Sequence, residues 1–457
     1  MSGSARHIGM QPGTVLRRIA RNSAVMAGGT AASALFSMLA VAVAARALTA
    51  RDFGVLVLLQ SAVLMVRAFT SFSTQQPVIK LGADAQAAND RNKLGRIISM
   101  GLVADLASSL AAFAIAILGI LLTGSLIGLA SEDAGSALIL AVSLLFSAYP
   151  TTNGIFRLYD RFGLFALLQT LSAAGLLGAF TLIFVFGPTL QAFVLAWAAY
   201  LAFSGLLQLL LALWLVRRDR VRLALRRGAF SSADGKVLIQ YCWTTWGTST
   251  VDTVRTNGDS LFVGAMVSVE AAGLYNVAKQ LAGTFRKFIL VYASTVFPEI
   301  SRLASNDDKA GARTLKRRMT IAGLAIGGAA VGAALLLGQP ALQLVFGERF
   351  GPAYIPLVVL MAAAAAQLIS FTPSMFVQVL LGPAKLLLYY VIGTGLFVAA
   401  AFSLTLAFGI TGMALAQLSF PIALAIMCEL GLRSGAVFRG RLANTRFETS
   451  PLEPSEE

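Results

Sequence analysis

The chain has 457 residues, of which 57% are hydrophobic and 12% charged, and its mean hydropathy is +0.77. Soluble domains usually carry about 25% charged residues, so the composition excludes a soluble globular protein and indicates a polytopic membrane protein. The formal net charge of +15 would suggest a nucleic-acid partner in a soluble protein, but here most of the excess lies in loops, where it indicates membrane topology, and we expect no nucleic-acid partner.

The first apolar run, residues 23–45, follows an N-terminal tail, residues 1–22, that holds four arginines. A basic segment before an apolar run is also typical of a secretory signal. The apolar core of a cleavable signal is about 7–15 residues long, whereas this run is longer and many others follow it. We therefore predict an uncleaved first transmembrane helix.

Apolar runs of about 20 residues, bounded by polar or Gly/Pro clusters, predict twelve transmembrane helices and hence an all-α membrane fold. The predicted spans are 23–45, 53–79, 97–123, 135–156, 163–187, 190–216, 237–265, 272–298, 319–338, 354–380, 386–408 and 411–432. The shortest separations are at 187–190 and 408–411, where a single Gly-Pro or Gly-Ile pair must turn the chain.

Lysine and arginine fall almost entirely on one side of these spans. With the N-terminus in the cytoplasm, the cytoplasmic segments hold 28 of the 36 Lys and Arg residues, the spans hold five, and the opposite side holds only Arg46, Arg51 and Arg349. Cytoplasmic loops of membrane proteins are enriched in these residues. The bias therefore predicts an even number of spans with both termini in the cytoplasm.

A basic segment, residues 217–236, divides the chain near its middle. We predict a cytoplasmic linker between an N-lobe of six helices, 23–216, and a C-lobe of six helices, 237–432. For this linker we favour a role in setting membrane orientation, with the segment lying against anionic lipid, over a regulatory or partner-binding role. The remaining residues, 433–457, are predicted to form a disordered cytoplasmic tail.

The two halves share a pattern that places an arginine inside each second helix. When Gly54 is aligned on Gly273, Arg67 falls on Arg286. A charge at the bilayer centre costs about 2.5–3.5 kcal/mol, and both arginines lie about 14 residues from the ends of their spans, beyond easy reach of the headgroups. We therefore predict a doubled protein with a polar, anion-binding site between its lobes, near a pseudo-two-fold axis.

Further charges lie on the seventh and eighth helices. Asp252, Arg255 and Asp259 share one face of the seventh helix, where they either neutralise one another as an ion cluster or couple an ion to transport. Lys279, seven residues before Arg286 on the eighth helix, either faces the cavity or extends to the headgroups.

Two other charged positions have a structural interpretation. Asp105, in the third helix, is expected to partner an arginine or to take part in ion coupling. Glu429 and Arg433 are spaced as an i,i+4 pair at the end of the twelfth helix, and we assign them a structural role.

Nothing in the predicted spans suggests catalysis or metal binding. Cys242 and Cys428 lie far apart and are expected to pack as small apolar residues. The one histidine lies in the N-terminal tail, so a histidine-based triad or metal centre cannot form within the membrane. No Gly-rich Walker-type loop is present, and we expect no nucleotide hydrolysis.

The paired arginines suit a phosphate ligand. Guanidinium groups bind phosphate oxygens through two hydrogen bonds and keep their charge when desolvated. One arginine from each lobe could hold a diphosphate while the gap between the lobes accommodates its lipid tail.

Four short segments resemble the bacterial polysaccharide-biosynthesis flippases. They are ARALTARDFGVL at 45–56, DSLFVG at 259–264, AAGLYNVA at 271–278 and VFPEISRL at 296–303. The first is similar to the start of the second helix in that family, and the others are similar to its seventh and eighth helices. Their order and spacing extend the resemblance over most of the chain.

The resemblance implies the fold of the multidrug/oligosaccharidyl-lipid/polysaccharide exporter superfamily, with two six-helix bundles facing each other in a V. It also implies alternating access for undecaprenyl-diphosphate-linked glycans in a bacterial inner membrane. In that family, cations in the central cavity contact the diphosphate or sugars, and by position Arg67, Arg255, Lys279 and Arg286 are the candidates. The sequence lacks the two extra C-terminal helices of lipid II flippases, and its aspartate pair in the seventh helix leaves Na⁺ or H⁺ coupling open.

The leading hypothesis is a flippase that moves a lipid-linked oligosaccharide to the periplasmic leaflet for O-antigen lipopolysaccharide, capsule or exopolysaccharide assembly. Its expected partners are the lipid-linked glycan, membrane lipids, and a polysaccharide polymerase with its export machinery. The first alternative is a cation-coupled drug exporter of the same superfamily, which would need an acid-rich cavity. The second is a membrane enzyme of polysaccharide assembly, which would need a large external loop or a catalytic histidine.

Overall fold

The computed structural model describes residues 12–123, 134–146, 150–224, 228–305 and 309–434, and in this part of the chain every regular element is a helix. The first half contains α1 (Pro12–Ala47), α2 (Ala50–Thr70), α3 (Gln75–Ala87), α4 (Arg91–Thr123), α5 (Ala134–Leu144), α6 (Pro150–Leu158), α7 (Phe162–Phe186) and α8 (Leu190–Arg218). The second half contains η2 (Ala229–Ser231), α9 (Ala233–Met266), α10 (Val269–Ser305), α11 (Lys309–Phe346), η3 (Glu348–Ala353), α12 (Tyr354–Leu380) and α13 (Pro383–Ser434).

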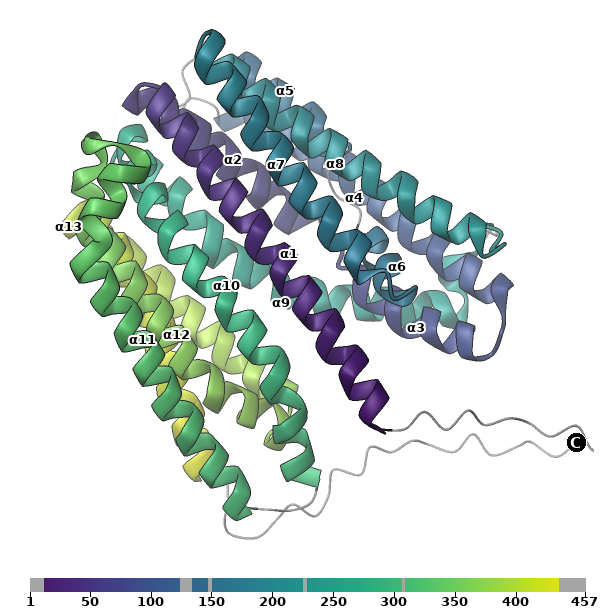
Figure 1. The fold of residues 1–457 in the computed structure, drawn as a ribbon. Helices are drawn as coiled ribbons and strands as arrows, with labels where there is room; N and C mark the ends of the chain where they lie inside the picture. Colours follow the sequence, from purple (N-terminus) through teal and green to yellow (C-terminus); the bar gives the residue numbers. More distant parts are fainter. Residues whose placement is uncertain (1–11, 124–133, 147–149, 225–227, 306–308, 435–457) are drawn as a thin grey trace, which may run out of the picture.

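The helices form two bundles that meet at one end and diverge toward the other (Figure 1). Helices α1 to α8 make one bundle, α10 to α13 make the other, and α9 lies between them. Helix α1 begins, and α10 ends, at the diverging end. The structure confirms the predicted all-α fold of two facing bundles in a V.

Two of the twelve predicted spans are broken, so the prediction of one continuous helix was wrong for each. The second span consists of α2 and α3, separated by residues 71–74, and the fourth consists of α5 and α6. A backbone amide at each break donates to a side chain of α4: Phe72 to Ser108 at the first and Thr151 to Asp105 at the second. Such partners let an apolar segment leave the helical conformation inside the protein.

The two shortest predicted turns are confirmed. Helix α7 ends at Phe186, and Gly187 adopts a φ of 150° before α8 begins. Within α13, Gly409 has a φ of 57° and a ψ of −133°, so that two helices are joined there by a sharp turn. A Cβ atom on the nearby Gly412 would overlap the carbonyl oxygen of Leu404, and only glycine permits this close approach.

Eight helices in the described residues are long and apolar enough to cross a membrane. This number is smaller than twelve because α13 contains two spans, α5 is short, and α9 and α10 carry the polar residues of the candidate site. In six of these eight helices less than a third of the apolar stretch is buried within the protein, as expected for helices that face lipid.

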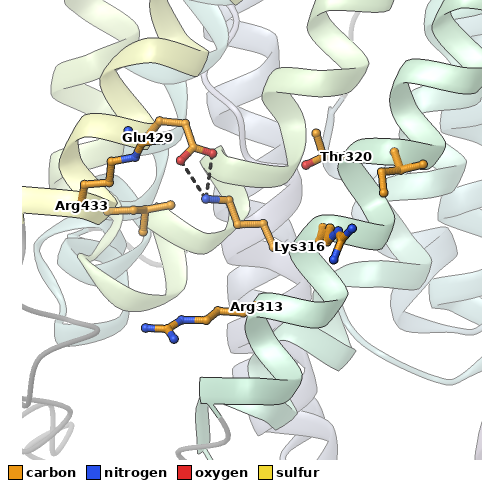
Figure 2. A pocket seen from close by; sticks show the side chains of 8 residues that line it. Arg313, Lys316, Thr320, Glu429 and Arg433 are labelled. Atoms are coloured by element: carbon orange, nitrogen blue, oxygen red, sulfur yellow. Dashed lines mark hydrogen bonds and ion pairs between the residues drawn. The ribbon is translucent and has the colours of Figure 1, made fainter.

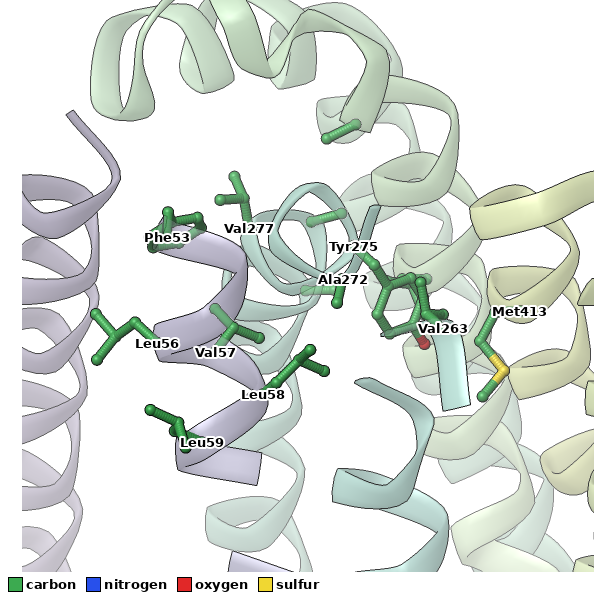
Figure 3. Packing of buried hydrophobic residues seen from close by; sticks show 14 of the residues in the cluster. Phe53, Leu56, Val57, Leu58, Leu59, Val263, Ala272, Tyr275, Val277 and Met413 are labelled. Atoms are coloured by element: carbon green, nitrogen blue, oxygen red, sulfur yellow. The ribbon is translucent and has the colours of Figure 1, made fainter. Parts of the chain in front are cut away.

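The main hydrophobic core is shared by both bundles at the end where they meet (Figure 3). Residues 53–59 of α2 are all buried, because α2 contacts α9 and α10 on one side and its own bundle on the other. Phe53 packs edge-on against Phe350 of η3, with ring centroids 5.7 Å apart. Arg46, at the end of α1, donates to the carbonyl oxygens of Leu344 and Val345 at the end of α11.

Helix α9 is attached to both bundles. In its first half, Asp234 forms an ion pair of 3.2 Å with Lys93 of α4, and Trp246 donates to the carbonyl oxygen of Phe69 at 3.0 Å. A second core cluster at this end of the first bundle includes the buried Cys242 of α9. The second half of α9 packs against α10 and α13, so the predicted lobe boundary at 237 falls within a helix that contacts both lobes.

Both cysteines are buried and free. Cys242 lies in the core cluster of the first bundle and Cys428 in the shared core. This placement confirms the prediction that each packs as a small apolar residue.

Candidate functional site

The two bundles touch through the pair of glycines that align in the sequence. A Cβ atom on Gly54 of α2 would overlap the carbonyl oxygen of Val269, and one on Gly273 of α10 would lie 3.4 Å from the Cα of Gly54. Helices α2 and α10 therefore cross in backbone contact, which small residues make possible. Because equivalent positions of the two halves face each other here, the pseudo-two-fold axis passes between these glycines.

Arg67 and Arg286 lie at equal distances from this crossing point. Each follows its glycine by 13 residues, which corresponds to about 20 Å along an α-helix. Both helices run from the crossing toward the end where the bundles diverge. Both side chains are half-buried, and the two arginines lie one on each bundle, at matching positions along α2 and α10.

Arg67 has no carboxylate partner among the described side chains. It lies in the last turn of α2, where its carbonyl oxygen accepts a hydrogen bond of 2.8 Å from the amide of Ser71. The ionisable group that interacts with its charge is the hydroxyl of Tyr200 on α8. A half-buried guanidinium without a carboxylate partner among the described side chains favours the binding of an anion.

Arg286 is half-buried and lies on α10 about three helical turns beyond Tyr275, whose hydroxyl its charge influences. The neighbouring Lys287 and the predicted coupling residue Asp252 have side chains outside the described part of the structure.

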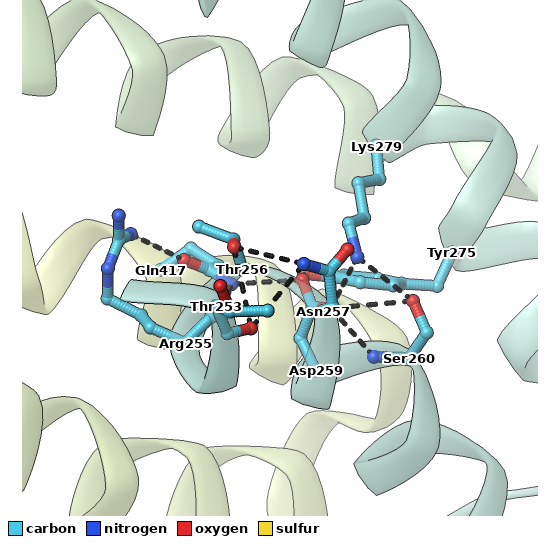
Figure 4. A network of polar contacts seen from close by, with 9 residues as sticks. All are labelled: Thr253, Arg255, Thr256, Asn257, Asp259, Ser260, Tyr275, Lys279 and Gln417. Carbon is cyan, nitrogen blue, oxygen red and sulfur yellow. Dashed lines mark hydrogen bonds and ion pairs between the residues drawn. The ribbon is translucent and has the colours of Figure 1, made fainter. Parts of the chain in front are cut away.

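The centre of the polar network in the second bundle is the buried carboxylate of Asp259 (Figure 4). Lys279 of α10 contacts its Oδ1 atom at 2.5 Å. Its Oδ2 atom accepts hydrogen bonds of 3.0 Å from Tyr275 on α10 and of 3.0 Å from Gln417 on α13. Helices α9, α10 and α13 are therefore joined at one carboxylate.

This geometry corrects two of the alternatives considered for these residues. Asp259 does not belong to a self-contained cluster on α9, because its partners Lys279 and Gln417 come from other helices. Lys279 does not extend to the headgroups, since its ammonium group points inward to Asp259 and Ser260.

Arg255 is held inside the same bundle, with only 3% of its surface exposed. Its Nη1 atom donates to Oε1 of Gln417 at 3.4 Å, and its guanidinium lies 4.3 Å from the ring centroid of Phe420. Gln417 in turn donates to the backbone carbonyl oxygen of Arg255 at 3.1 Å. In this conformation Arg255 and Lys279 are held by protein contacts within the second bundle.

Asp105 joins the two broken helices of the first bundle. Its Oδ1 atom accepts from the hydroxyl of Thr74 at 2.6 Å, and its Oδ2 atom accepts from the amide of Thr151 at 2.8 Å. The hydroxyl of Thr151 donates to that of Thr74 at 2.9 Å. Asp105 is fully buried, and its hydrogen-bond partners are these threonines, which does not support the first of the two alternatives, pairing with an arginine.

The predicted pair of Glu429 and Arg433 was wrong. Glu429 instead binds Lys316 of α11, whose ammonium group lies 2.7 and 2.8 Å from its two carboxylate oxygens. A contact between helices prevails here because Lys316 is partly shielded from solvent, whereas Arg433 at the helix end is exposed.

Three contributors to the site were not predicted from the sequence. Gln417, Phe420 and Thr151 gain their roles from partners on distant helices. The only local signal was at the start of α6, where a proline followed by two threonines is typical of a helix N-terminus.

The family of the chain follows from comparison with known proteins. Residues 19–304 match the family described as polysaccharide biosynthesis protein. The chain belongs to this family. Among curated relatives, the inner membrane protein YghQ of Escherichia coli (strain K12) is 28% identical over 343 residues, covering 74% of this chain and 95% of that protein.

This chain shares its fold with solved transporters. An inward-facing multidrug resistance MATE family transporter of the MOP superfamily superposes with a TM-score of 0.69 at 14% identity, over 89% of this chain and 96% of that one. The lipid II flippase MurJ in an inward closed conformation also gives 0.69 at 14% identity, over 90% and 87%. The Vibrio cholerae MATE transporter VcmN in the bent form gives 0.59 at 13% identity, over 93% and 99%.

These comparisons identify a multi-pass membrane protein with the fold of the multidrug/oligosaccharidyl-lipid/polysaccharide exporters. The solved structures that share this fold are transporters and a flippase, not enzymes. The resemblance seen in the short motifs is thereby confirmed at the level of family and fold.

Proposed function

We propose that this protein is a flippase for an undecaprenyl-diphosphate-linked oligosaccharide in a bacterial inner membrane. The family description supports a role in polysaccharide biosynthesis, the curated relative is an inner membrane protein, and the fold is shared with the lipid II flippase MurJ. The cargo would move from the cytoplasmic to the periplasmic leaflet for O-antigen, capsule or exopolysaccharide assembly.

The observation that carries the proposal is the placement of Arg67 and Arg286. They lie equally far beyond the touching glycines, one on each bundle, on helices that diverge from a common crossing point. A diphosphate offers oxygens to two guanidinium groups at once, each forming charge-assisted hydrogen bonds. Two bundles that hold one anion between them would release it when they reorient.

The open end of the V corresponds to the side predicted to be cytoplasmic, so a substrate would enter from there. The cationic loops predicted to be cytoplasmic connect helices at the diverging end, including the end of α10 and the start of α11. The closed end carries Arg46, one of the three cations predicted to lie outside. In this orientation the site would be loaded from the leaflet where lipid-linked sugars are synthesised.

A cation-coupled drug exporter would need an accessible acid in its cavity. The acids that sequence analysis proposed for coupling and whose side chains are described, Asp105 and Asp259, are 0% and 2% exposed. Both accept several hydrogen bonds from protein groups. These acids are therefore poorly placed to bind a cationic drug directly.

The proposal is tested in the source bacterium after deletion of the chromosomal gene, with plasmid copies of Arg67→Ala and Arg286→Ala. We expect each variant to lower surface polysaccharide by at least about tenfold, the effect of losing one charged hydrogen bond, and lipid-linked oligosaccharide to accumulate inside. Lysine at either position should restore part of the activity, because it keeps the charge but not the fork of donors.

The matched control is Arg217→Ala, which removes an exposed arginine from the end of α8. This variant should make normal polysaccharide, and immunoblots of membranes should show equal amounts of all variants. Normal polysaccharide in both Arg67→Ala and Arg286→Ala would contradict the proposed clamp.

A further inference from the structure

A cavity of about 510 Å³ lies between α11 and α13, away from the paired arginines (Figure 2). It is at the end of the molecule where α11 begins and α13 ends, and its volume is within the range of small-molecule sites. Its lining residues are Arg313, Lys316, Arg317, Thr320, Ile321, Glu429, Leu432 and Arg433. Four cations thus surround one carboxylate, and the cavity has a strong positive charge.

The single carboxylate is already neutralised within the protein. Both oxygens of Glu429 contact the ammonium group of Lys316, at 2.7 and 2.8 Å. Arg317 and Arg433 are exposed, and among the described residues neither has a carboxylate partner. Since Arg317 lies four residues after Arg313 on α11, both project from one face of that helix. The cavity therefore offers guanidinium groups from two helices to an external anion.

The other side of the cavity is apolar and continues into the lipid-facing surface. Ile321 and Leu432 line it. Leu324, one turn beyond Ile321 on α11, is 56% exposed, and Leu430, between Glu429 and Leu432 on α13, is 58% exposed. A ligand that fits both sides has an anionic head and an apolar tail, because an inorganic anion would leave the apolar side in contact with water.

We propose that this cavity binds the phosphate of a lipid headgroup at the membrane surface, through Arg317 and Arg433. Lys316 and Glu429 join the two helices and hold the cavity in shape. The bound chemistry is a phosphate ester on an acyl or isoprenoid chain, and the two sources are an anionic phospholipid of the bilayer and undecaprenyl phosphate. The site is separate from the proposed clamp of Arg67 and Arg286, and its existence does not depend on transport.

The experiment uses the purified full-length protein and native mass spectrometry, which counts the lipids bound to each molecule. The protein is titrated in parallel with phosphatidylglycerol, phosphatidylcholine, undecaprenyl phosphate and inorganic phosphate. The test variant is Arg317→Gln with Arg433→Gln, and the control is Arg318→Gln, which changes an exposed neighbour that does not line the cavity. Equal melting temperatures and elution volumes show that the variants are folded.

We expect the double variant to bind the phosphate lipid roughly tenfold more weakly than the wild type, as two charge-assisted contacts are lost. Arg318→Gln should bind normally, and Arg317→Lys with Arg433→Lys should be intermediate. Preference for phosphatidylglycerol over phosphatidylcholine identifies a bilayer phospholipid, and preference for undecaprenyl phosphate identifies the carrier lipid. Undiminished lipid binding by the double variant, or binding of inorganic phosphate without either lipid, overturns the proposal.

Discussion

Asp259 shows how strongly one residue can constrain a membrane transporter. Its carboxylate is 2% exposed and has Lys279, Tyr275 and Gln417 as partners. Burial removes the solvation of both charges of the ion pair, so each charge depends on the other. The pair therefore links α9 to α10, and loss of one member leaves an uncompensated charge in the bundle.

We predict that Asp259→Asn or Lys279→Met alone lowers the free energy of unfolding by about 3–5 kcal/mol. The double variant should recover much of this loss, because no unpaired charge remains. Denaturant unfolding in detergent, followed by tryptophan fluorescence, measures the effect.

The control for this prediction is the more exposed pair of Lys316 and Glu429, whose side chains are 21% and 37% exposed. Lys316→Met should cost less than about 1 kcal/mol, since water screens a pair at the surface. Equal costs for Lys279→Met and Lys316→Met would show that burial does not set the strength of the first pair.

Among the elements, the broken helices are organised by a single side chain. Asp105 on α4 accepts from Thr74 before α3 and from the amide of Thr151 at the start of α6. It accepts from a side-chain hydroxyl at the first break and from a backbone amide at the second, where a continuous helix would have satisfied that amide itself. The short helices α3 and α6 thus depend on α4 for their positions.

We predict that Asp105→Ala lowers the free energy of unfolding by about 1–3 kcal/mol, because the buried amide of Thr151 loses its acceptor. Asp105→Asn should cost less, since its remaining carbonyl oxygen can still accept one bond. The control is Thr181→Ala, which removes an exposed hydroxyl that bonds only to the carbonyl of Leu177 in its own helix. Equal stability of Asp105→Ala and the wild type, in the same denaturant assay, would contradict this role.

The elements that could be predicted from the sequence are those set by local chemistry. The turns at Gly187 and Gly409 were predictable because apolar runs must be interrupted somewhere, and glycine tolerates positive φ. The break at residues 71–74 was not predictable, because Asp105, which binds Thr74, is 31 residues away and on another helix.

The candidate site could likewise be predicted only in part. The positions of Arg67 and Arg286 followed from the internal repeat, which the sequence displays directly. The partner of Asp259 on α13, Gln417, is 158 residues away, and no local pattern marks it. Charges could therefore be located along the helices, but their pairing required the tertiary arrangement.

For the whole molecule, the contact between Gly54 and Gly273 holds the closed end together. A Cβ atom at Gly54 would overlap the carbonyl oxygen of Val269 across the interface, and backbone atoms cannot rotate away as a side chain can. The bundles can keep this close approach only while both positions lack side chains.

We predict that Gly54→Ala separates the closed ends and shifts the population toward conformations open on that side. Spin labels at Thr189 and Leu344, both exposed near that end of their bundles, report the separation after both buried cysteines are replaced by alanine. The distance distribution should move to longer values.

The matched control is Gly175→Ala on α7, where no atom lies within 4 Å of the added Cβ. This variant should give the wild-type distance distribution. An unchanged distribution in Gly54→Ala would mean that the helices adjust locally and that the glycine contact does not determine closure.

The attachment of α9 to both bundles has a mechanical consequence. Hydrogen bonds and ion pairs join its first half to α2 and α4 and its second half to α10 and α13, with Thr250 and Arg255 on either side of the change. The second half also packs against Leu58 of α2 at Gly264, so a swing of one bundle against the other must bend the turn between Thr250 and Arg255 or shift that contact. The stiffness of that turn would limit how fast the protein cycles, so softening it should alter turnover while leaving the affinity for cargo almost unchanged.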